Sequence, residues 1–285
     1  MLKSIVTLCV RHFGAVSALS LLALILGCWG ALKSPLDVFP EFVPSAVDVQ
    51  TEAPGLAPQQ VEELVTKHSA IMDKYDPEKK VALVVDEWGV WTDVEPGTNP
   101  GFLYQQNSLR DALIAGTTLN IFNNHSDRVR MAALAQTVNV LQSLILTNKE
   151  KMVLTPTYHI FDMYKVHQDA KYLPIKLDVP NYEVDGKKIQ AVNASASQDS
   201  TGKVHISLVN LDMHNAITIT TELKDVKWSA IKGQVLTSAN ITDINTFANP
   251  NKLHLVSFTG AKKDGDKLVV TLPAKSVVTL ELQPL

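Results

Sequence analysis

Three patterns of hydrophobic and polar residues follow one another along the chain. From Phe13 to Leu32, twenty successive residues carry no charge, and a helix of that length spans about 30 Å, the thickness of a bilayer core. From residue 67 to 170, hydrophobic runs alternate with amphipathic segments, as expected where strands and helices alternate. Beyond residue 170, short runs place hydrophobic residues at every second position, as in antiparallel strands. The chain therefore predicts a membrane helix, an α/β segment and an all-β segment.

The charges around the first segment predict its orientation. Lys3 and Arg11 precede the uncharged residues, and only one lysine, Lys33, follows before a stretch of acidic residues up to position 66. The positive-inside rule then places the N-terminus in the cytoplasm and makes the segment a single-pass anchor. A cleaved signal peptide is the alternative, but the uncharged stretch is long for one and no small-x-small cleavage site closes it.

The residues after this segment contain a recognisable motif, SPLDVFPEF followed by VDVQTEAPGLAPQQVEELVT. Within it, Val47–Thr51 alternates like a strand, and Pro58 begins a short helix that ends at Val65. Residues 1–66 resemble the start of heavy-metal-type resistance-nodulation-division efflux pumps, in which a first membrane helix leads into a periplasmic porter region. Such pumps need about a dozen membrane helices, and one segment here has sufficient apolar length. Transport by this chain alone is therefore not expected.

Residues 67–170 predict about two βα units. Val81–Val85 is a continuous hydrophobic run, typical of a strand buried on both faces, and Asp86 and Glu87 follow it directly. Acidic residues at the carboxyl end of a buried parallel strand are where α/β enzymes place their chemistry. The remaining expected elements are a helix over 106–120, a strand over 129–134, and helices over 139–146 and 158–167.

Residues 171–285 predict an antiparallel β-sandwich of about seven or eight short strands. Trp228 is the only tryptophan in this segment, so a sugar-binding role for the segment is not favoured. Turns are expected at the glycines of 185–186, 201–202 and 264–265. Strands are expected at 189–197, 204–210, 216–223, 231–236, 254–258, 268–272 and 276–282.

Four motifs between residues 84 and 168 carry a second resemblance: VVDEWGVW, PGFLYQQNSLRDALIAG, HSDRVRMAALAQTVNVLQSLILT and MVLTPTYHIFDMYKVHQ. From about residue 67 to the end, the chain resembles the C-terminal half of family-51 glycoside hydrolases, the α-L-arabinofuranosidases. The resemblance implies that 67–170 is the last two or so βα units of a catalytic (β/α)8 barrel and that 171–285 is the family's C-terminal β-sandwich. The expected fold class is thus α/β plus all-β, preceded by residues 1–66 with one transmembrane helix and the start of a pump porter region.

The resemblance also assigns an activity and site residues. It implies retaining hydrolysis of arabinofuranosyl groups from arabinan and arabinoxylan, with Glu87 as nucleophile and with Trp91 and Gln136 binding the sugar. No cofactor or metal is implied, and homo-oligomers are common in the family. The roles fit the residue types, since a nucleophilic carboxylate must be fixed near the anomeric carbon, and aromatic rings and amides suit sugar CH and hydroxyl groups.

One catalytic group is not found. A retaining mechanism needs a second carboxyl about 5 Å from the first, and the resemblance places it on a glutamate that follows an asparagine in an earlier barrel strand. Residues 1–66 contain no asparagine, and Glu95, Asp111 and Glu150 offer no obvious substitute. The chain alone is therefore expected to be inactive.

Charge and cysteine content exclude other classes. The net charge of −3 comes from residues 1–66, and the rest of the chain balances 23 basic against 23 acidic residues. The sequence contains no cluster of basic residues, which argues against a nucleic acid as partner. Cys9 and Cys28 are the only cysteines, which excludes a disulfide scaffold or a cysteine-ligated metal site beyond them. His125, His159 and His167 lack metal-ligand spacing and are expected to be hydrogen-bonded structural residues.

Three alternatives remain open at this point. The chain could be a membrane-anchored structural or carbohydrate-binding β-domain, a non-functional fragment of an efflux transporter, or the product of a faulty gene model. Localisation is also open, because a spanning first helix would export the hydrolase-like segment, whereas the lack of cysteine after residue 28 and the family fit the cytoplasm equally well.

Overall fold

The computed structural model describes residues 2–33, 46–47, 58–184, 186–224 and 226–285. The chain divides into two units, Met1–Val43 and Pro44–Leu285. The first unit contains α1 (Leu2–Arg11) and α2 (Phe13–Lys33), so the helix expected over 13–32 is present.

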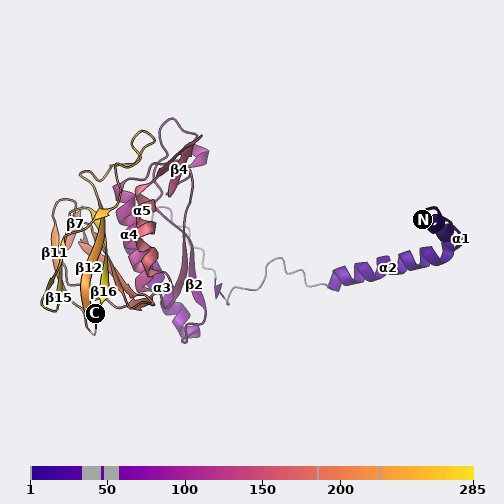
Figure 1. Cartoon of the computed structure of the whole chain (residues 1–285), viewed down its shortest axis with the longest axis horizontal. Helices are drawn as coiled ribbons and strands as arrows, with labels where there is room; N and C mark the ends of the chain where they lie inside the picture. The colour runs from indigo at the N-terminus through magenta and orange to yellow at the C-terminus, as the bar shows by residue number, and fades with distance from the viewer. Residues whose placement is uncertain (1, 34–45, 48–57, 185, 225) are drawn as a thin grey trace. The chain divides into compact units, whose positions relative to one another are not determined.

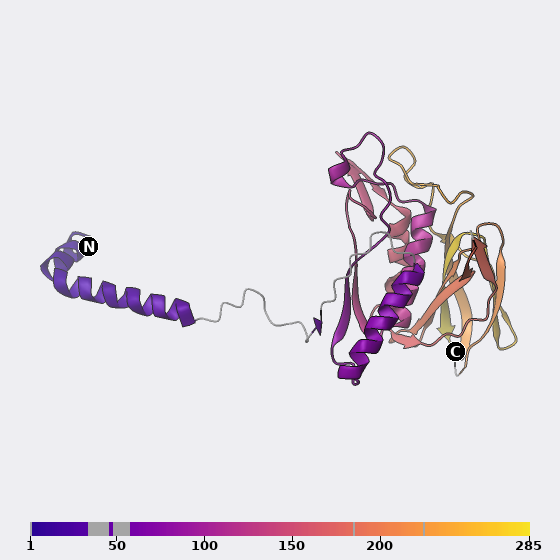
Figure 2. The same ribbon diagram turned by 180° about the vertical axis from the view of Figure 1, so that it is seen from behind.

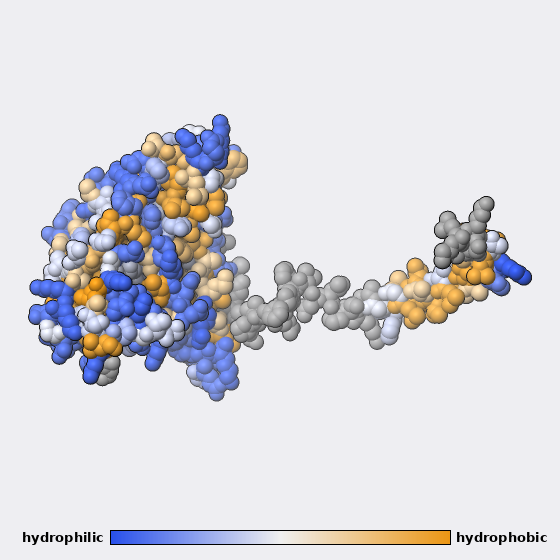
Figure 3. All heavy atoms as spheres, in the orientation of Figure 1, coloured by the Kyte–Doolittle hydropathy of each residue, from blue (hydrophilic) through white to orange (hydrophobic). Residues whose placement is uncertain are grey.

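Helix α2 carries hydrophobic residues around its whole circumference, and they cover most of the face seen in Figure 3. Its stretch Phe13–Gly30 has a mean hydropathy of 1.9 and is long and apolar enough to cross a membrane. A signal sequence near an N-terminus has the same length and composition. Length and hydropathy thus agree with both readings of this helix.

The second unit begins with a parallel sheet of three strands in the order β1-β2-β3 (Figure 1). These strands are β1 (Ala46–Val47), β2 (Ala82–Trp88) and β3 (Val129–Leu134). The strands expected at 81–85 and 129–134 are confirmed. Of the strand expected at 47–51, residues 48–51 lie outside the described residues.

The expectation that the first of these strands is buried on both faces is wrong. In β2, Leu83 and Trp88 are buried, Val84 and Val85 are half-buried, and Asp86 and Glu87 are exposed. The physical reason is the size of the sheet, because three strands packed against helices have cover on one face. Continuous hydrophobic runs belong to strands covered on both faces.

Helix α3 (Pro58–Tyr75) is longer than the sequence indicates, and it runs through the expected boundary between residues 66 and 67. Val65 is buried, and Val61 and Met72 pack against the same hydrophobic core. The three residues are spaced by four and seven positions, so they share one face of the helix. Residues from both sides of the expected boundary therefore contribute to one core.

A polar contact also joins α3 to the rest of the unit. His125 Nε2 lies 2.7 Å from Glu62 Oε1, and this hydrogen bond raises the pKa of His125, although burial lowers it. A raised histidine pKa contributes stability below about pH 6.5, and the contribution is lost as the pH rises through the folded-state pKa. We expect Glu62→Gln to lower the pKa of His125 and to reduce the free energy of unfolding at pH 5.5 by up to about 1 kcal/mol. NMR titration of the His125 ring and denaturant unfolding at pH 5.5 and 8 measure both quantities.

The matched control for this prediction is Glu63→Gln. Glu63 is the neighbouring acid on α3, and its partner is the exposed Lys67. This variant should leave the His125 titration unchanged. A His125 pKa that is the same in Glu62→Gln and in the parent chain would contradict the prediction.

Helix α4 (Leu109–Asn124) connects β2 to β3. It starts three residues later than expected, because Ser108 caps it: the Ser108 backbone N–H donates to Asp111 Oδ2 at 2.8 Å in a capping box. Before it lies a short 3-10 helix, Pro100–Phe102. Helix α5 (Pro156–Tyr164) continues as a 3-10 turn to His167, which confirms the helix expected over 158–167.

The helix expected over 139–146 is wrong. This segment is a loop that leads into a hairpin of β4 (Ile145–Asn148) and β5 (Lys151–Leu154). Asn139 and Gln142 both have positive φ values. The side chain of Asn139 bonds Thr147, accepting from its backbone N–H and donating to its hydroxyl, each at 2.7 Å. Such local side-chain bonds compete with a helix, and the hydrophobic pattern does not record them.

The remaining strands form two antiparallel sheets and a hairpin. The larger sheet has the order β13-β12-β16-β10-β9-β6, the smaller has the order β11-β15-β14, and β7 pairs with β8. The bounds are β6 Lys171–Leu173, β7 Asn181–Val184, β8 Lys187–Gln190, β9 Val192–Gln198, β10 Val204–Asn210, β11 Ile217–Glu222, β12 Trp228–Thr237, β13 Val256–Ser257, β14 Ala261–Asp264, β15 Lys267–Leu272 and β16 Ser276–Pro284. All seven segments expected as strands contain strand residues.

Two hydrophobic cores hold these layers together. One lies between the two antiparallel sheets and includes Leu208, Val278 and Val270. The other joins the opposite face of the larger sheet to α3, α4, α5 and β2, so the helices lie between the parallel and antiparallel sheets (Figures 1 and 2). Gly116 permits the close approach of α4, because a Cβ atom there would lie 3.1 Å from Val209 Cγ2.

The three histidines named above are confirmed as hydrogen-bonded, His159 through the backbone of Leu253. His125 contacts Glu62, and the ring nitrogens of His167 lie 2.7 and 2.6 Å from the hydroxyls of Ser197 and Ser207. Burial lowers the pKa of His167 to about 4, and nearby His205 adds to the effect. His167 therefore remains neutral near pH 7 and fastens the end of α5 to β9 and β10.

Candidate active site

Glu87 is the next-to-last residue of β2, at the carboxyl end of the strand, and its side chain is exposed. The Glu87 carboxylate makes no hydrogen bond or ion pair with another residue in the part of the chain that the structure describes. The next residue, Trp88, is buried. Its ring stacks on Phe161 with a centroid distance of 6.1 Å and meets Phe122 edge-on at 5.6 Å. Trp88 thus fixes the strand end that presents Glu87 to solvent.

The other two predicted site residues follow the ends of neighbouring strands. Trp88 is in register with Leu134 of β3, and the next backbone N–H, that of Ala135, donates to Trp88 O at 3.0 Å. Gln136 follows a cis peptide bond, is exposed, and donates its backbone N–H to Leu141 O at 2.7 Å. Trp91 is 51% exposed and lies three residues beyond β2. All three predicted residues therefore belong to segments at one edge of the parallel sheet.

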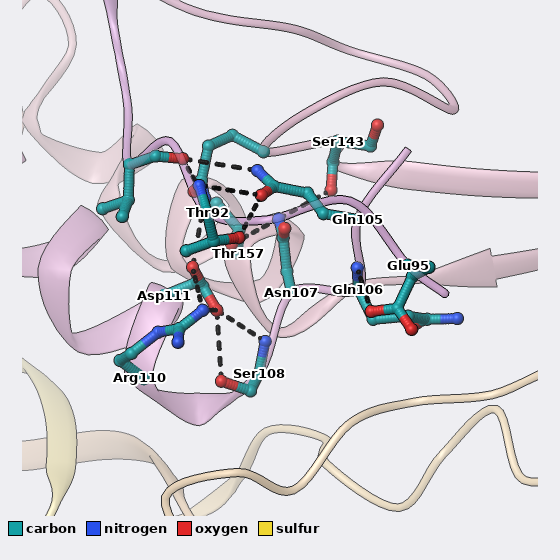
Figure 4. Close-up of polar contacts among 12 residues, drawn as sticks. Thr92, Glu95, Gln105, Gln106, Asn107, Ser108, Arg110, Asp111, Ser143 and Thr157 are labelled. Carbon is teal, nitrogen blue, oxygen red and sulfur yellow. Dashed lines mark hydrogen bonds and ion pairs between the residues drawn. The ribbon is translucent and has the colours of Figure 1, made fainter. Parts of the chain in front are cut away.

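A polar network fixes the backbone on both sides of Trp91 (Figure 4). Gln142 Nε2 donates to Val90 O at 3.0 Å, and Gln105 Nε2 donates to the same oxygen at 3.3 Å. Gln105 Oε1 accepts from the Thr92 backbone N–H at 3.2 Å and also from the Thr92 hydroxyl. The segment that carries Trp91 is held by buried side chains from two other parts of the chain.

Asp111 lies at the centre of this network. Its side chain is 1% exposed. Its Oδ1 accepts from Gln142 Nε2 at 3.0 Å, and its Oδ2 accepts from the Ser108 backbone N–H at 2.8 Å. Arg110 Nη2 donates to both oxygens, at 3.2 and 3.1 Å. Both carboxylate oxygens already accept hydrogen bonds, which agrees with a structural role for Asp111 and not with that of a proton donor.

Sequence reasoning missed this network, although one signal was available. Ser108 and Asp111 have the spacing of a capping box, which is readable from sequence. Gln142 could not be found in the same way, because it lies in the loop that the hydrophobic pattern assigned to a helix. Its left-handed backbone and its partners depend on the tertiary structure.

A pocket of about 130 Å³ adjoins the end of β2, with walls from α3, β2 and α4. Asp86 and Glu87 are the acidic residues that line it. Helices α3 and α4 contribute hydrophobic side chains, His68 and Thr118 to its walls, and no carboxylate. The pocket therefore does not set a second carboxyl opposite Glu87.

The other acids named from the sequence have separate surroundings. Glu95 Oε1 accepts from the Gln106 backbone N–H at 3.2 Å, and Glu150 is exposed in the turn between β4 and β5. Among the described residues, no group of three or more His, Cys, Asp or Glu side chains is arranged to hold a metal ion.

Comparison with known proteins identifies this architecture. Residues 86–276, more than half of the chain, match the family model of the α-L-arabinofuranosidase C-terminal domain. The chain belongs to this family. Residues 5–69 match a second model, that of the AcrB/AcrD/AcrF family, so both resemblances seen in the sequence are confirmed. The second match ends inside α3, six residues before the end of that helix.

Relatives of this arabinofuranosidase-family chain are longer than the chain itself. An intracellular exo-α-L-arabinofuranosidase from Bacteroides ovatus is 51% identical over 225 residues, which are 79% of this chain and 44% of the relative. The crystal structure of the GH51 arabinofuranosidase from Xanthomonas axonopodis pv. citri superposes with a TM-score of 0.78 at 52% identity, covering 79% of this chain and 46% of that one. An exo-α-(1→6)-L-arabinofuranosidase from Bifidobacterium longum is 27% identical over 69% of this chain and 41% of its own length. The chain thus spans less than half the length of these relatives.

Proposed function

We propose that residues 67–285 are the C-terminal part of a retaining α-L-arabinofuranosidase and that Glu87 occupies the nucleophile position. The position of Glu87, exposed at the carboxyl end of a parallel strand and anchored by the buried Trp88, is the observation that carries this proposal. Trp91 and Gln136, on segments that leave the same sheet edge, would contact the sugar through an aromatic face and an amide. The substrates are then arabinofuranosyl-containing oligosaccharides.

The fold supports the same reading at a finer level. We assign β2, α4 and β3 to the last two or so βα units of a (β/α)8 barrel, because the two strands are parallel and joined by a helix. We assign the two antiparallel sheets, packed on a shared hydrophobic core, to the family's C-terminal β-sandwich.

The chain alone is proposed to be inactive. Double displacement needs an acid/base carboxyl about 5 Å from the nucleophile. The α3 and α4 walls of the pocket beside Glu87 carry no acid, and Asp111 is occupied by donors.

The test is release of 4-nitrophenol from 4-nitrophenyl α-L-arabinofuranoside by the full chain in detergent micelles. We expect no turnover above that of Glu87→Ala, with the Bacteroides ovatus relative as the positive control. Turnover by the parent chain that disappears in Glu87→Ala would overturn the inactivity while supporting the role of Glu87.

We also propose that α2 anchors the chain as a single-pass membrane helix with a cytoplasmic N-terminus. Its length, its hydropathy and the preceding Lys3 and Arg11 support this orientation. The Bacteroides ovatus relative is described as intracellular, which favours the cytoplasm for a hydrolase of this kind. Protease digestion of sealed spheroplasts decides between the two compartments, because an exported unit is cleaved and a cytoplasmic one is protected.

A further inference from the structure

We propose that Gln142 is a positioning residue that fixes the Trp91 segment to the Gln136 segment. The inference rests on the proposed function, since it concerns the two segments proposed to contact the sugar. The Trp91 segment follows β2 and the Gln136 segment follows β3. Gln142 is proposed to hold these two segments in a fixed position relative to each other.

The position of Gln142 is the first argument. The residue lies in the loop of 135–144 that also carries Gln136, and it is 2% exposed. It has a positive φ of 54°, and its side chain contacts Gly89 and Val90. The amide donates to Val90 O and to Asp111 Oδ1, each at 3.0 Å. One side chain therefore connects the loop after β3, the segment after β2 and the first turn of α4.

The close fit at Gly89 is the second argument. A Cβ atom at Gly89 would lie 2.9 Å from Gln142 Cγ and 3.5 Å from Ala135 O. Gly89 also has a φ of +151°, which side-chain-bearing residues rarely adopt. The backbone between Glu87 and Trp91 thus packs directly against the Gln142 side chain at Gly89, where the absence of a Cβ atom permits the contact.

The anchoring of both neighbours of Trp91 is the third argument. Val90 is bonded to Gln142 and Gln105, and Thr92 is bonded twice to Gln105, yet the Trp91 side chain between them is 51% exposed. Fixed backbone on both sides of a solvent-facing aromatic ring is the arrangement that pre-organises a ligand contact. Gln142 supplies the connection that ties this ring to the Gln136 loop.

The chemistry of the contact requires an amide. Val90 O and Asp111 Oδ1 are both acceptors, so the group between them must donate two hydrogen bonds, as a glutamine NH₂ does. In Gln142→Glu the side chain keeps its shape, but its carboxylate oxygen faces two other acceptors and repels them.

The experiment uses the full chain in detergent micelles, labelled with 5-fluorotryptophan and observed by fluorine NMR without sugar. The chain has four tryptophans, and the line that is lost in Trp91→Phe assigns Trp91. In Gln142→Glu we expect the Trp91 line to shift or broaden while the line of Trp228 in β12 stays in place. A matched control is Gln198→Glu, because Gln198 Nε2 also donates to a backbone carbonyl, that of Gly202, at 3.2 Å. It should leave the Trp91 line unchanged.

A Trp91 line that is unchanged in folded Gln142→Glu overturns the proposal. If that variant does not fold, the Trp228 line is lost as well. Gln142→Met, which keeps the side-chain volume but has no hydrogen-bond donor, then replaces it, and an unchanged Trp91 line in Gln142→Met overturns the proposal. A second measurement is hydrogen exchange of the Thr92 amide, whose protection should fall in Gln142→Met and not in Gln198→Met. Because no sugar is present, failure here leaves the nucleophile assignment of Glu87 intact, and failure of that assignment leaves this result intact.

Discussion

Loss of Glu87 should abolish hydrolysis in a completed enzyme. We expect a chimera, in which the N-terminal part of the Bacteroides ovatus relative precedes residues 67–285, to hydrolyse 4-nitrophenyl α-L-arabinofuranoside. Glu87→Gln in this chimera should lower kcat/KM by at least about 10³-fold, because an amide cannot attack the anomeric carbon. The identity of 51% over the matched region makes this join feasible. Initial rates over a range of substrate concentrations measure the effect.

Two further measurements separate a nucleophile from a binding residue. Glu150→Gln, an exposed glutamate in the β4–β5 turn, should leave kcat/KM within about twofold of the parent, as expected for surface positions. In Glu87→Ala, azide can attack the anomeric carbon in place of the carboxylate and expel 4-nitrophenolate, which gives a glycosyl azide of inverted configuration. An active chimera in which Glu87→Gln retains its rate would refute the assignment.

The largest effect on stability is expected at Arg128. Its side chain is 1% exposed. Nη1 donates to Asp76 Oδ2 at 2.7 Å and to Val81 O at 2.8 Å, and Nη2 donates to Asp76 O at 2.8 Å and to the carboxylate of Asp73. Arg128→Met leaves these acceptors without their donor. We expect it to lower the free energy of unfolding by about 3 kcal/mol, the lower end of the range for breaking a buried ion pair, since Asp73 is partly exposed.

Denaturant unfolding of the full chain, followed by tryptophan fluorescence, measures this loss. Arg130→Met is the control, because Arg130 is exposed and donates to Asp127 O at a distance of 3.3 Å. It should change the free energy of unfolding by no more than about 0.5 kcal/mol. Equal losses in the two variants would show that the buried guanidinium does not hold the α3–β2 loop in place.

The hydrophobic pattern predicted the helices and strands that have a clear periodicity. It failed where tertiary contacts determine the backbone conformation. The run at 81–85, the strand at 129–134 and the alternating segment at 204–210 all appear as strands. The segment at 139–146 has enough hydrophobic residues for a helix, but side-chain bonds of Asn139 and Ser143 to nearby backbone atoms stabilise a loop. Periodicity reports burial and does not report such local bonds.

The candidate site shows the same division. Glu87, Trp91 and Gln136 could be named from motifs, and the structure places them on segments at one sheet edge. The side chains that hold those segments, Gln105 and Gln142, could not be named. Their partners are backbone groups of Val90 and Thr92, the Thr92 hydroxyl and the Asp111 carboxylate, all at least 13 positions away in the sequence.

The continuity of α3 constrains how a segment that matches the AcrB/AcrD/AcrF family model can pack on the core of the second unit. A helix turns by about 100° per residue, so one residue inserted between Thr66 and Lys67 would rotate Val61 and Val65 by that angle relative to Met72. The sequence as it stands keeps all three within a narrow arc, and Glu62 in contact with His125. The match to the AcrB/AcrD/AcrF family model therefore ends inside a folding unit and not at its border. The first turns of α3, which match that model, pack on the same core as the rest of the helix because their rotational phase matches it.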